Sequence, residues 1–338
     1  MKISRRENLI NVLKGGEGEK VPFVPFVGVH AAKVLEVGLK DFLSSSDLIA
    51  KGVVKSAKLY NADGIPLCFD LQIEAELLGC GVKYLDKMPP AVIKHPLAKG
   101  SLSDLNVYEP NSGRLKCVLD AIESIRAELG DNTALYALVS GVLTLAYQLR
   151  GRALLEDIAN RADSLIPLLA YCRDIQLKTI KAYAERGVDV VAVVEPLCSN
   201  LDIDFFKELL PFENDLFDYI NDLGLLSSFF LCGDVNELLD EICESRCHNI
   251  SVCSNVNLSV LREKALKAKK SFGGNLNPRS DILNCSKEET ILKTKQCLDI
   301  GKTKAFVFST GCDLAFDSPS ESLIAISQVI SNYLKKSQ

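Results

Sequence analysis

The chain has 338 residues, 47% of them hydrophobic and 25% charged, which suits a globular protein with a large buried core. Its formal net charge of −5 offers neither a basic surface for nucleic acid nor a polybasic membrane anchor. The N-terminus lacks the apolar stretch of a signal peptide, and no apolar run has the roughly 18 residues that span a bilayer. We therefore expect a cytoplasmic protein that keeps its 12 cysteines reduced.

Short apolar segments alternate with longer segments of helical periodicity along the whole chain. An N-terminal helical extension is expected over residues 1–20. The apolar segments that follow have the length and composition of parallel strands covered on both faces. The sequence predicts eight such strands, at residues 21–27, 63–67, 135–139, 189–194, 227–231, 249–252, 271–274 and 305–308.

The segments between the strands carry helix-start signals. Three of them have the spacing of a capping box, Asp234-x-x-Glu237, Ser286-x-x-Glu289 and Ser318-x-x-Glu321. Eight strand–helix units in succession favour a closed barrel over an open sheet. The predicted fold class is therefore α/β, with residues 1–338 forming a single (β/α)8 TIM barrel domain.

One connection is much longer than the others. Residues 68–113 follow the second strand and contain Gly79, Gly81, Pro89 and Pro90, which suit turns better than a continuous helix. Loops of this length in a compact domain are usually functional. Since the segment leaves the C-terminal end of a strand, we expect a lid-like insertion that covers the barrel mouth.

Active sites of this fold lie at the C-terminal ends of the strands. Glu195 follows the fourth predicted strand, Cys232 the fifth and Cys312 the eighth. Thiolates and carboxylates are common zinc ligands, and three of them leave one tetrahedral position for a substrate. The sequence thus predicts a zinc site at Glu195, Cys232 and Cys312. Two alternatives stay open: the cysteines are structural, or Cys253, which follows the sixth strand, takes a ligand position.

Several segments occur together in a fixed order: Phe69-Asp70-Leu71-Gln72, Ser140-Gly141-Val142-Leu143, Leu231-Cys232-Gly233-Asp234, Gly274-Asn275-Leu276-Asn277-Pro278 and Gly311-Cys312. Together they resemble the uroporphyrinogen decarboxylase superfamily, and within it the corrinoid-dependent methyltransferases. The resemblance covers almost the whole chain. The decarboxylases proper carry an Arg-Gln-Ala-Gly-Arg signature near the N-terminus, which residues 25–30 lack, so porphyrinogen decarboxylation is not expected.

The resemblance implies a particular zinc site. Coenzyme M methyltransferases of the superfamily bind zinc through a His-x-Cys pair and a later cysteine, but Phe230 occupies the histidine position here. A pattern of Glu195, Cys232 and Cys312 is similar to methyltransferase I of the anaerobic aryl O-demethylases. That similarity implies one zinc ion per chain and methyl transfer from an aryl methyl ether to a Co(I) corrinoid. Zinc would act there as a Lewis acid on the ether oxygen.

Further residues are assigned by their place after strands. His30 and Asp70 are candidate catalytic residues, with an exposed histidine and a helix-capping aspartate as the alternatives. Asn275, Asn277 and Tyr147 are candidate substrate-binding residues. The asparagines also suit plain turn chemistry, and Tyr147 also suits the core.

The corrinoid is expected to come from a partner. The chain has no Asp-x-His-x-x-Gly motif, so we expect a separate corrinoid protein to carry the cofactor to the barrel mouth. Two other functions stay open: methyl transfer from a methyl-corrinoid to a thiol of the coenzyme M type, and a non-catalytic barrel that binds a corrinoid protein. The sequence leaves the methyl donor and homodimer formation undecided.

Overall fold

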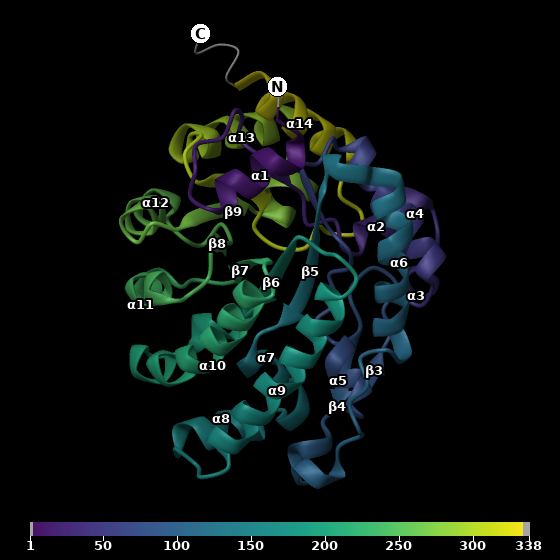
Figure 1. Cartoon of the computed structure of the whole chain (residues 1–338), viewed down its shortest axis with the longest axis vertical. Coiled ribbons are helices and arrows are strands. Elements are labelled where there is room, and N and C mark those ends of the chain that lie inside the picture. Colours follow the sequence, from purple (N-terminus) through teal and green to yellow (C-terminus); the bar gives the residue numbers. More distant parts are fainter. Residues whose placement is uncertain (1–2, 334–338) are drawn as a thin grey trace.

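The computed structural model describes residues 3–333, and a single sheet of eight parallel strands forms its centre. Helices surround the sheet, as Figure 1 shows, and the predicted α/β barrel is confirmed. The strands follow one another in the order β1-β10-β9-β8-β7-β6-β5-β2. Their bounds are β1 Phe23–Val24, β2 Gly64–Pro66, β5 Ala134–Ser140, β6 Val190–Val194, β7 Leu226–Leu231, β8 Asn249–Val252, β9 Ser271–Leu276 and β10 Phe306–Thr310.

Asp63 closes the barrel between β1 and β2. Its backbone N–H donates to the carbonyl oxygen of Phe23 at 2.9 Å, and its carboxylate accepts from the Phe23 N–H at 2.8 Å. Lys20 forms an ion pair with the same carboxylate at 2.6 Å. On its other side, β1 pairs with β10, where Phe23 lies opposite Phe308. The first and last strands of the chain therefore meet.

The first strand is shorter than the sequence predicts. Only Phe23–Val24 pairs as a strand, whereas the apolar composition predicted residues 21–27. Pro22 and Pro25 flank the two paired residues, and proline has no N–H with which to extend a ladder. The remaining predicted strands match observed ones to within two residues at each end.

The helical layer follows the predicted alternation. The 3-10 and π turns are η1 Pro96–Ala98, η2 Leu102–Asp104, η3 Gly130–Asn132, η4 Pro196–Asn200, η5 Asn236–Leu238 and η6 Pro278–Leu283. Within the described residues, no helix combines the length and the apolar character needed to cross a bilayer. The α-helices are α1 Arg5–Leu13, α2 His30–Leu35, α3 Leu39–Phe42, α4 Ser46–Leu59, α5 Ile73–Leu77, α6 Gly113–Leu129, α7 Val142–Arg150, α8 Ala153–Ala159, α9 Leu165–Ala184, α10 Ile203–Asp222, α11 Leu239–Glu244, α12 Leu258–Lys267, α13 Lys287–Gly301 and α14 Ser320–Tyr333.

One of the three predicted capping boxes forms. Ser286 and Glu289 exchange hydrogen bonds at the start of α13, as predicted. The prediction at Asp234 is wrong, because its carboxylate accepts from Asn236 two residues later and no side chain caps α11. The prediction at Ser318 is also wrong, since α14 begins at Ser320 and the buried Ser318 hydroxyl finds no partner among the described residues.

An apolar core fills the barrel. Alternate residues of each strand face inward, and helix α1 of the N-terminal segment packs against this core with Leu9, Val12 and Leu13. Residues 1 and 2 of the predicted N-terminal extension lie outside the described part. The inward-facing residues of the strands and their ends are Val24, Phe26, Phe69, Ala134, Tyr136, Leu138, Val190, Ala192, Val194, Leu226, Phe230 and Val307.

The insertion after β2 folds into structure of its own. It contains α5, then an antiparallel hairpin of β3 Gly81–Lys83 and β4 Ala91–Lys94, and then η1 and η2. In Figure 1 it lies beside α6, in the lower part of the view. The loop between the two hairpin strands places Lys87, Met88 and Pro89 against the pocket described below, and the role of the insertion as a lid stays a prediction.

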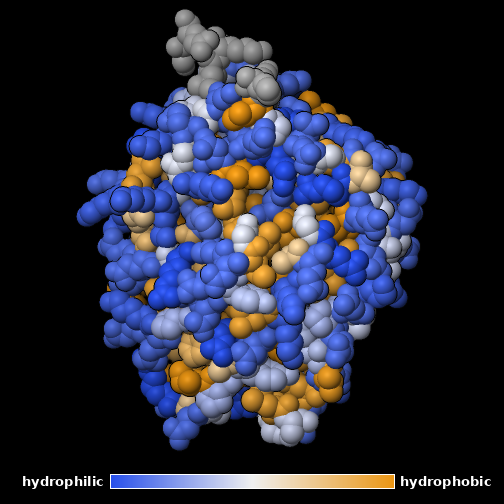
Figure 2. Space-filling model, viewed as in Figure 1, coloured by the Kyte–Doolittle hydropathy of each residue, from blue (hydrophilic) through white to orange (hydrophobic). Residues whose placement is uncertain are grey.

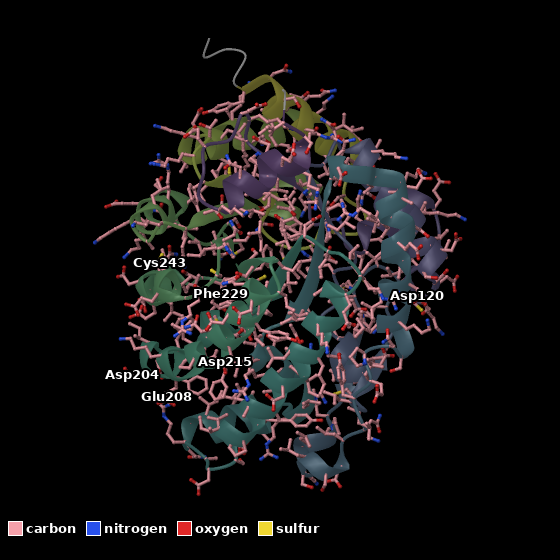
Figure 3. The ribbon with its side chains drawn as sticks, viewed as in Figure 1. Asp120, Asp204, Glu208, Asp215, Phe229 and Cys243 are labelled. Carbon is pink, nitrogen blue, oxygen red and sulfur yellow. The ribbon has the colours of Figure 1, made fainter. Side chains whose placement is uncertain are left out.

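The outer surface is largely hydrophilic. Figure 2 shows scattered hydrophobic residues and a more apolar area near the middle of the face in view. In Figure 3, Asp204 and Glu208 of α10 lie at the edge of the molecule, and both are exposed. Phe229 of β7 lies inside and is fully buried, where its ring packs against that of Phe217 with centroids 5.1 Å apart.

Candidate functional site

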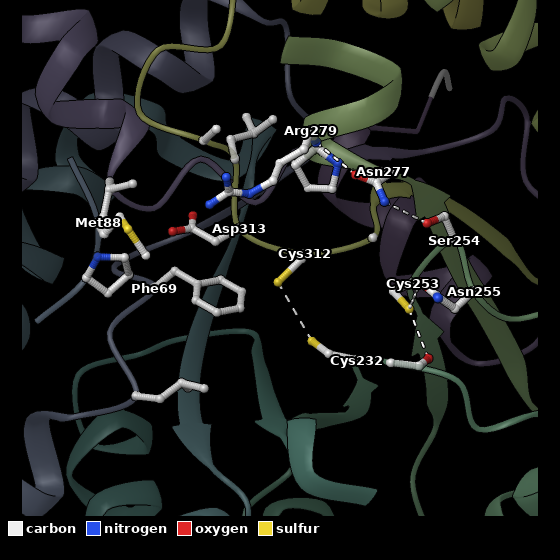
Figure 4. Close-up of a pocket in the computed structure, with 18 of the residues that line it drawn as sticks. Phe69, Met88, Cys232, Cys253, Ser254, Asn255, Asn277, Arg279, Cys312 and Asp313 are labelled. Carbon is white, nitrogen blue, oxygen red and sulfur yellow. Dashed lines mark hydrogen bonds between the residues drawn. The ribbon is translucent and has the colours of Figure 1, made fainter. Parts of the chain in front are cut away.

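A pocket of about 400 Å³ opens at the C-terminal ends of the strands. This is the end at which TIM barrels carry their active sites. Figure 4 shows two cysteines at its floor and an arginine and an aspartate on its wall. The pocket is lined by Val29, Phe69, Leu71, Gln72, Lys87, Met88, Pro89, Cys232, Gly233, Cys253, Ser254, Asn255, Asn277, Pro278, Arg279, Gly311, Cys312, Asp313, Leu314 and Ala315.

Cys232 and Cys312 come together as predicted, although 80 residues separate them in the chain. Their sulfur atoms are 3.7 Å apart (Figure 4). Two thiolates on one tetrahedral zinc ion, each about 2.3 Å from the metal, lie about 3.8 Å apart. The spacing of the two sulfurs and the chemistry of the pair therefore fit two ligands of one zinc ion.

Local backbone structure explains how Cys232 reaches the pocket. It follows β7 directly and continues the inward-facing set of that strand, which includes Phe230. The next residue, Gly233, has φ +85°, a conformation that favours glycine, so the chain turns away at this point. Cys312 lies two residues beyond the end of β10 and packs against the same apolar core.

The pKa values of the two thiols are shifted in opposite directions. The hydrogen bond from Cys232 lowers the pKa of the Cys312 thiol to about 7, although burial acts in the opposite direction. The same hydrogen bond raises the pKa of Cys232 well above its ordinary value, and burial adds to this effect. Near neutral pH the pair therefore carries up to one negative charge, held mainly on Cys312.

The floor beneath the thiols is apolar and aromatic. The rings of Phe26 and Phe230 have centroids 4.7 Å apart, and Phe69 packs edge-on against Phe230 at 5.9 Å. Cys232 and Cys312 pack against this cluster. Because the surroundings are apolar, charged and polar groups of a bound molecule will interact strongly with the few polar groups of the pocket.

Glu195, the third predicted ligand, follows β6 and forms no metal-binding group with the thiol pair, although its charge is near enough to contribute to the raised pKa of Cys232. Its fully buried carboxylate accepts hydrogen bonds from the backbone N–H of Thr144 at 2.9 Å, from the Thr144 hydroxyl, and from the N–H of Leu197 at 3.2 Å. Across residues 3–333, no three His, Cys, Asp or Glu side chains form a group that could hold a metal ion. The structure thus brings two of the three predicted ligands together.

A second buried carboxyl lies beside Glu195. Glu213 of α10 accepts a hydrogen bond from the N–H of Val142 at 2.9 Å, at the start of α7. Burial raises the pKa of Glu195 to about 7, and burial together with the charge of Glu195 raises that of Glu213 well above its usual range. No ion pair of the described residues includes either carboxyl, so the two lack a compensating cation.

Cys253, the alternative ligand, lines the pocket wall after β8. Its thiol donates to the carbonyl oxygen of Gly233 at 3.0 Å, and burial raises its pKa. In Figure 4 it lies beside Asn255, on the far side of Cys232 from Cys312. Its role as a ligand stays a prediction.

The two catalytic candidates are held in buried networks and do not line the pocket. The His30 ring bonds to the Phe316 carbonyl oxygen at 3.0 Å and to the Tyr60 hydroxyl at 2.6 Å, and burial lowers its pKa. Asp70 forms a buried ion pair with Arg114. Both arrangements support the fold, and the catalytic roles of His30 and Asp70 stay predictions.

The substrate-binding candidates differ in position. Asn277 lines the pocket, while the side chain of Asn275 donates to the carbonyl oxygen of Val256 at 3.1 Å. Tyr147 of α7 lies outside the pocket lining, and its ring packs near that of His95, with centroids 6.4 Å apart. Of the three, Asn277 is the one that the structure places where a substrate could reach it.

Of the three charged residues that line the pocket, Lys87 lies in the insertion that the sequence predicts, and the other two were missed by reasoning from the sequence. Asp313 follows Cys312, and burial raises its pKa well above the usual range of a carboxyl. Arg279 follows Pro278 at the start of η6. Their position in the sequence could have indicated both of them, because each lies within two residues of a residue already assigned to the site, Cys312 or Asn277.

Comparison with known proteins agrees with this architecture. The methylcobamide:CoM methyltransferase MtbA of Methanosarcina acetivorans is 25% identical over 336 residues, covering 97% of this chain and 98% of that protein. The methylcobamide:CoM methyltransferase MtaA of Methanosarcina barkeri is 22% identical over 331 residues, covering 95% and 96% of the two chains. A methyltransferase structure from Methanosarcina mazei superposes with a TM-score of 0.90 at 21% identity, covering 98% of this chain and 100% of that chain.

The family relationship extends over nearly the whole described chain. The profile of the uroporphyrinogen decarboxylase (URO-D) family matches residues 4–333. That span contains all eight strands and both cysteines of the thiol pair. The resemblance seen in the sequence is thereby confirmed: the chain belongs to the uroporphyrinogen decarboxylase (URO-D) family.

Proposed function

We propose that this chain is a methyltransferase that moves the methyl group of a methylcobamide, carried by a separate corrinoid protein, to a small thiol. The observation that carries the proposal is the pair of sulfur atoms of Cys232 and Cys312, 3.7 Å apart on the floor of the barrel-mouth pocket. The names of the relatives, methylcobamide:CoM methyltransferases, support the same reaction. This reading reverses the direction of transfer favoured by the sequence.

Zinc is the cofactor that the thiol pair fits, with Cys232 and Cys312 as two thiolate ligands. A zinc ion bound there would lower the pKa of a substrate thiol, so that its sulfur is held as the nucleophilic thiolate. Glu195 remains the proposed third ligand. To reach the thiol pair, its carboxylate would exchange the hydrogen bonds from Thr144 for the metal. No basic residue of the described part forms an ion pair with this buried carboxylate, so the exchange would not have to break one, and this supports the exchange.

The remaining pocket residues provide the surroundings that methyl transfer needs. Phe69 and Met88 line the pocket beside the thiols and limit water near the reacting sulfur. Cys312, whose thiol has the lower pKa of the pair, supplies negative charge to a bound cation. Since a cobamide must approach the same sulfur, the pocket has to stay open toward a partner protein.

The first test is metal content, compared between wild type and the variants Cys232→Ser, Cys312→Ser and Glu195→Gln. We expect about one zinc ion per chain in wild type and loss of zinc in all three variants. Cys285→Ser is the matched control, because Cys285 lies outside the pocket lining. Zinc retained by the Glu195→Gln protein would contradict the assignment of the third ligand alone.

The second test is methyl transfer from methylcobalamin to a small thiol, followed by the absorbance change of the cobalamin. Cys232→Ser and Cys312→Ser should lose the activity, while the Cys285→Ser control should retain it. A wild-type protein that contains no metal and transfers no methyl group would contradict the proposal. That result would instead favour a non-catalytic barrel that binds a corrinoid protein.

A second candidate function is O-demethylation of an aryl methyl ether, with Co(I) cobalamin as the methyl acceptor. It is favoured by Phe69, whose ring lines the pocket and packs edge-on against the buried Phe230 at 5.9 Å, so that an aromatic substrate would meet an aromatic side chain there. Zinc would then polarise the ether oxygen instead of a thiol. Formation of methylcobalamin from Co(I) cobalamin and methoxybenzoate, without methylation of thiols, would favour this reaction over the first.

A further inference from the structure

The first turn of α7 is held by two buried carboxylates that come from other elements. Gly141 precedes this helix and has no side chain that could cap it, so the first N–H groups of the helix need acceptors from elsewhere. Glu213 of α10 accepts from the N–H of Val142 at 2.9 Å, and Glu195 accepts from the N–H of Thr144 at 2.9 Å. Two acid side chains therefore share one helix turn, at the end where the helix dipole favours negative charge.

The two carboxylates differ in how many of their oxygens are bonded. In Glu195, Oε2 accepts from the Thr144 N–H, and Oε1 accepts from the Thr144 hydroxyl and from the N–H of Leu197. Glu213 uses only Oε1, and its Oε2 has no hydrogen-bond partner among the described residues, although the side chain is fully buried. A buried acceptor without a donor costs free energy, so this oxygen needs an explanation.

Glu195 cannot bind a metal at the thiol pair without leaving this turn. Its carboxylate would give up the N–H and the hydroxyl of Thr144. Because Thr144 is only 6% exposed, the N–H left behind would be a buried donor without an acceptor. The Oε2 atom of Glu213 is a free acceptor in the same turn, since the other oxygen of that carboxylate already bonds to Val142, two residues before Thr144.

We propose that Glu213 is a positioning residue for the metal site: when Glu195 moves to the metal, the free oxygen of Glu213 accepts the hydrogen bond from the Thr144 N–H that Glu195 gives up. The proposal rests on the proposed function and adds the residue that allows the third ligand to leave α7. Glu213 itself touches neither the metal nor a substrate. It strengthens metal binding because it lowers the free-energy cost of moving Glu195.

The test is the affinity of the full chain for zinc, measured by competition with a chromophoric chelator and without any methyl transfer. In Glu213→Gln, the side-chain oxygen can still accept from Val142, but the second oxygen becomes an NH2 group, which donates. This group cannot accept from Thr144, and it can donate to Glu195 and hold that carboxylate at α7. The zinc Kd should rise about 10- to 100-fold, the effect of one buried donor left without an acceptor.

A change at Thr144 should have the opposite effect on zinc binding. Thr144→Val removes the hydroxyl that holds Glu195 at α7 and keeps the backbone N–H. Since one hydrogen bond fewer has to break, the zinc Kd should fall about two- to tenfold. Glu208→Gln, at an exposed position of the same helix as Glu213, is the matched control and should leave the zinc Kd unchanged.

The stability of the metal-free protein distinguishes a positioning residue from one that only supports the fold. Glu213→Gln keeps the bond to Val142, so the free energy of unfolding in urea without metal should not fall below that of wild type. A residue with a purely structural role would lower that free energy instead. A loss of zinc affinity without a loss of metal-free stability therefore supports the proposal.

Several results would overturn the proposal. They are an unchanged zinc Kd in Glu213→Gln, a weaker zinc affinity in Thr144→Val, a metal-free Glu213→Gln protein that is less stable than wild type, and a wild-type protein that binds no zinc. The first three would leave the proposed function intact. If the zinc affinities follow the expected order but no thiol is methylated, the proposal stands and only the proposed function fails.

Discussion

Replacing Glu74 by glutamine is expected to remove one contribution to the pH dependence of the protein's stability. Glu74 lies on α5 of the insertion and is 2% exposed. Burial is the main cause that raises its pKa from 4.5 to about 8, and the negative charge of Asp70 makes a smaller contribution in the same direction. The folded state therefore binds a proton at this carboxyl over a pH range in which the unfolded state has released it.

The sign and size of the effect follow from this difference. A carboxyl with a raised pKa lowers the free energy of unfolding as pH rises from 4.5 toward 8, because the folded chain binds more protons than the unfolded chain. At about 1.4 kcal/mol for each pH unit, the full penalty is roughly 5 kcal/mol above pH 8. Glutamine is neutral at every pH, so the variant does not carry this penalty.

Urea unfolding followed by circular dichroism at pH 5, 6.5 and 8.5 provides the measurement, since the chain has no tryptophan. The Glu74→Gln protein should have a stability close to wild type at pH 5 and exceed it by a few kcal/mol at pH 8.5. Glu123→Gln, at an exposed position of α6, is the control, and its free energy of unfolding should depend on pH in the same way as that of wild type. Parallel curves for Glu74→Gln and wild type would refute the reasoning.

Three further substitutions test other parts of the structure. Arg114→Met should lower the free energy of unfolding by about 3–5 kcal/mol, because it leaves Asp70 buried and unpaired; a smaller loss in urea would show that water reaches the carboxylate. Phe230→Ala should cost about 3–5 kcal/mol in the same assay, and a cost below about 1 kcal/mol would contradict tight packing at the pocket floor. Gly141→Ala should lower the melting temperature, because the added Cβ would lie 2.8 Å from that of Glu195; an unchanged calorimetric scan would show that the start of α7 can shift.

The sequence predicts the barrel well because its strands are nearly continuous apolar runs with helical segments between them. It predicts the insertion by its length and its glycines and prolines, but not its hairpin. The two strands of that hairpin are only three and four residues long, each ends in a lysine, Lys83 or Lys94, and Ile93 is 64% exposed. Pairing between such strands depends on contacts that no local pattern encodes.

Position after a strand end was not sufficient to predict which residues of the candidate site come together. Glu195 and Cys232 both follow strands on the same rim, and the prediction treated them alike. Alternation separates them: Val194 faces into the barrel, so Glu195 points outward beneath α7, whereas Phe230 faces inward and Cys232 two residues later does too. Cys312 lies beyond its strand, where alternation no longer applies.

Contacts with residues that are distant in the chain determine how the two catalytic candidates are placed. His30 is the first residue of α2, but its two ring nitrogens bond to Phe316 and Tyr60, which are distant in the chain. Asp70 meets Arg114 across the whole insertion, 44 residues away. A sequence shows that such polar residues stand near strand ends, but it does not show which of them already have partners in the folded protein.

The pairing of β1 with β10 has a consequence for the order of events during synthesis. The N–H of Phe26 donates to the Thr310 hydroxyl, a contact across 284 residues, and Phe23 lies opposite Phe308. The barrel cannot close on a ribosome until β10 has emerged, so the edges of β1 and of the most recent strand stay unpaired during most of translation. Because unpaired strand edges favour aggregation, nascent chains of this protein should depend on chaperones until that last strand docks.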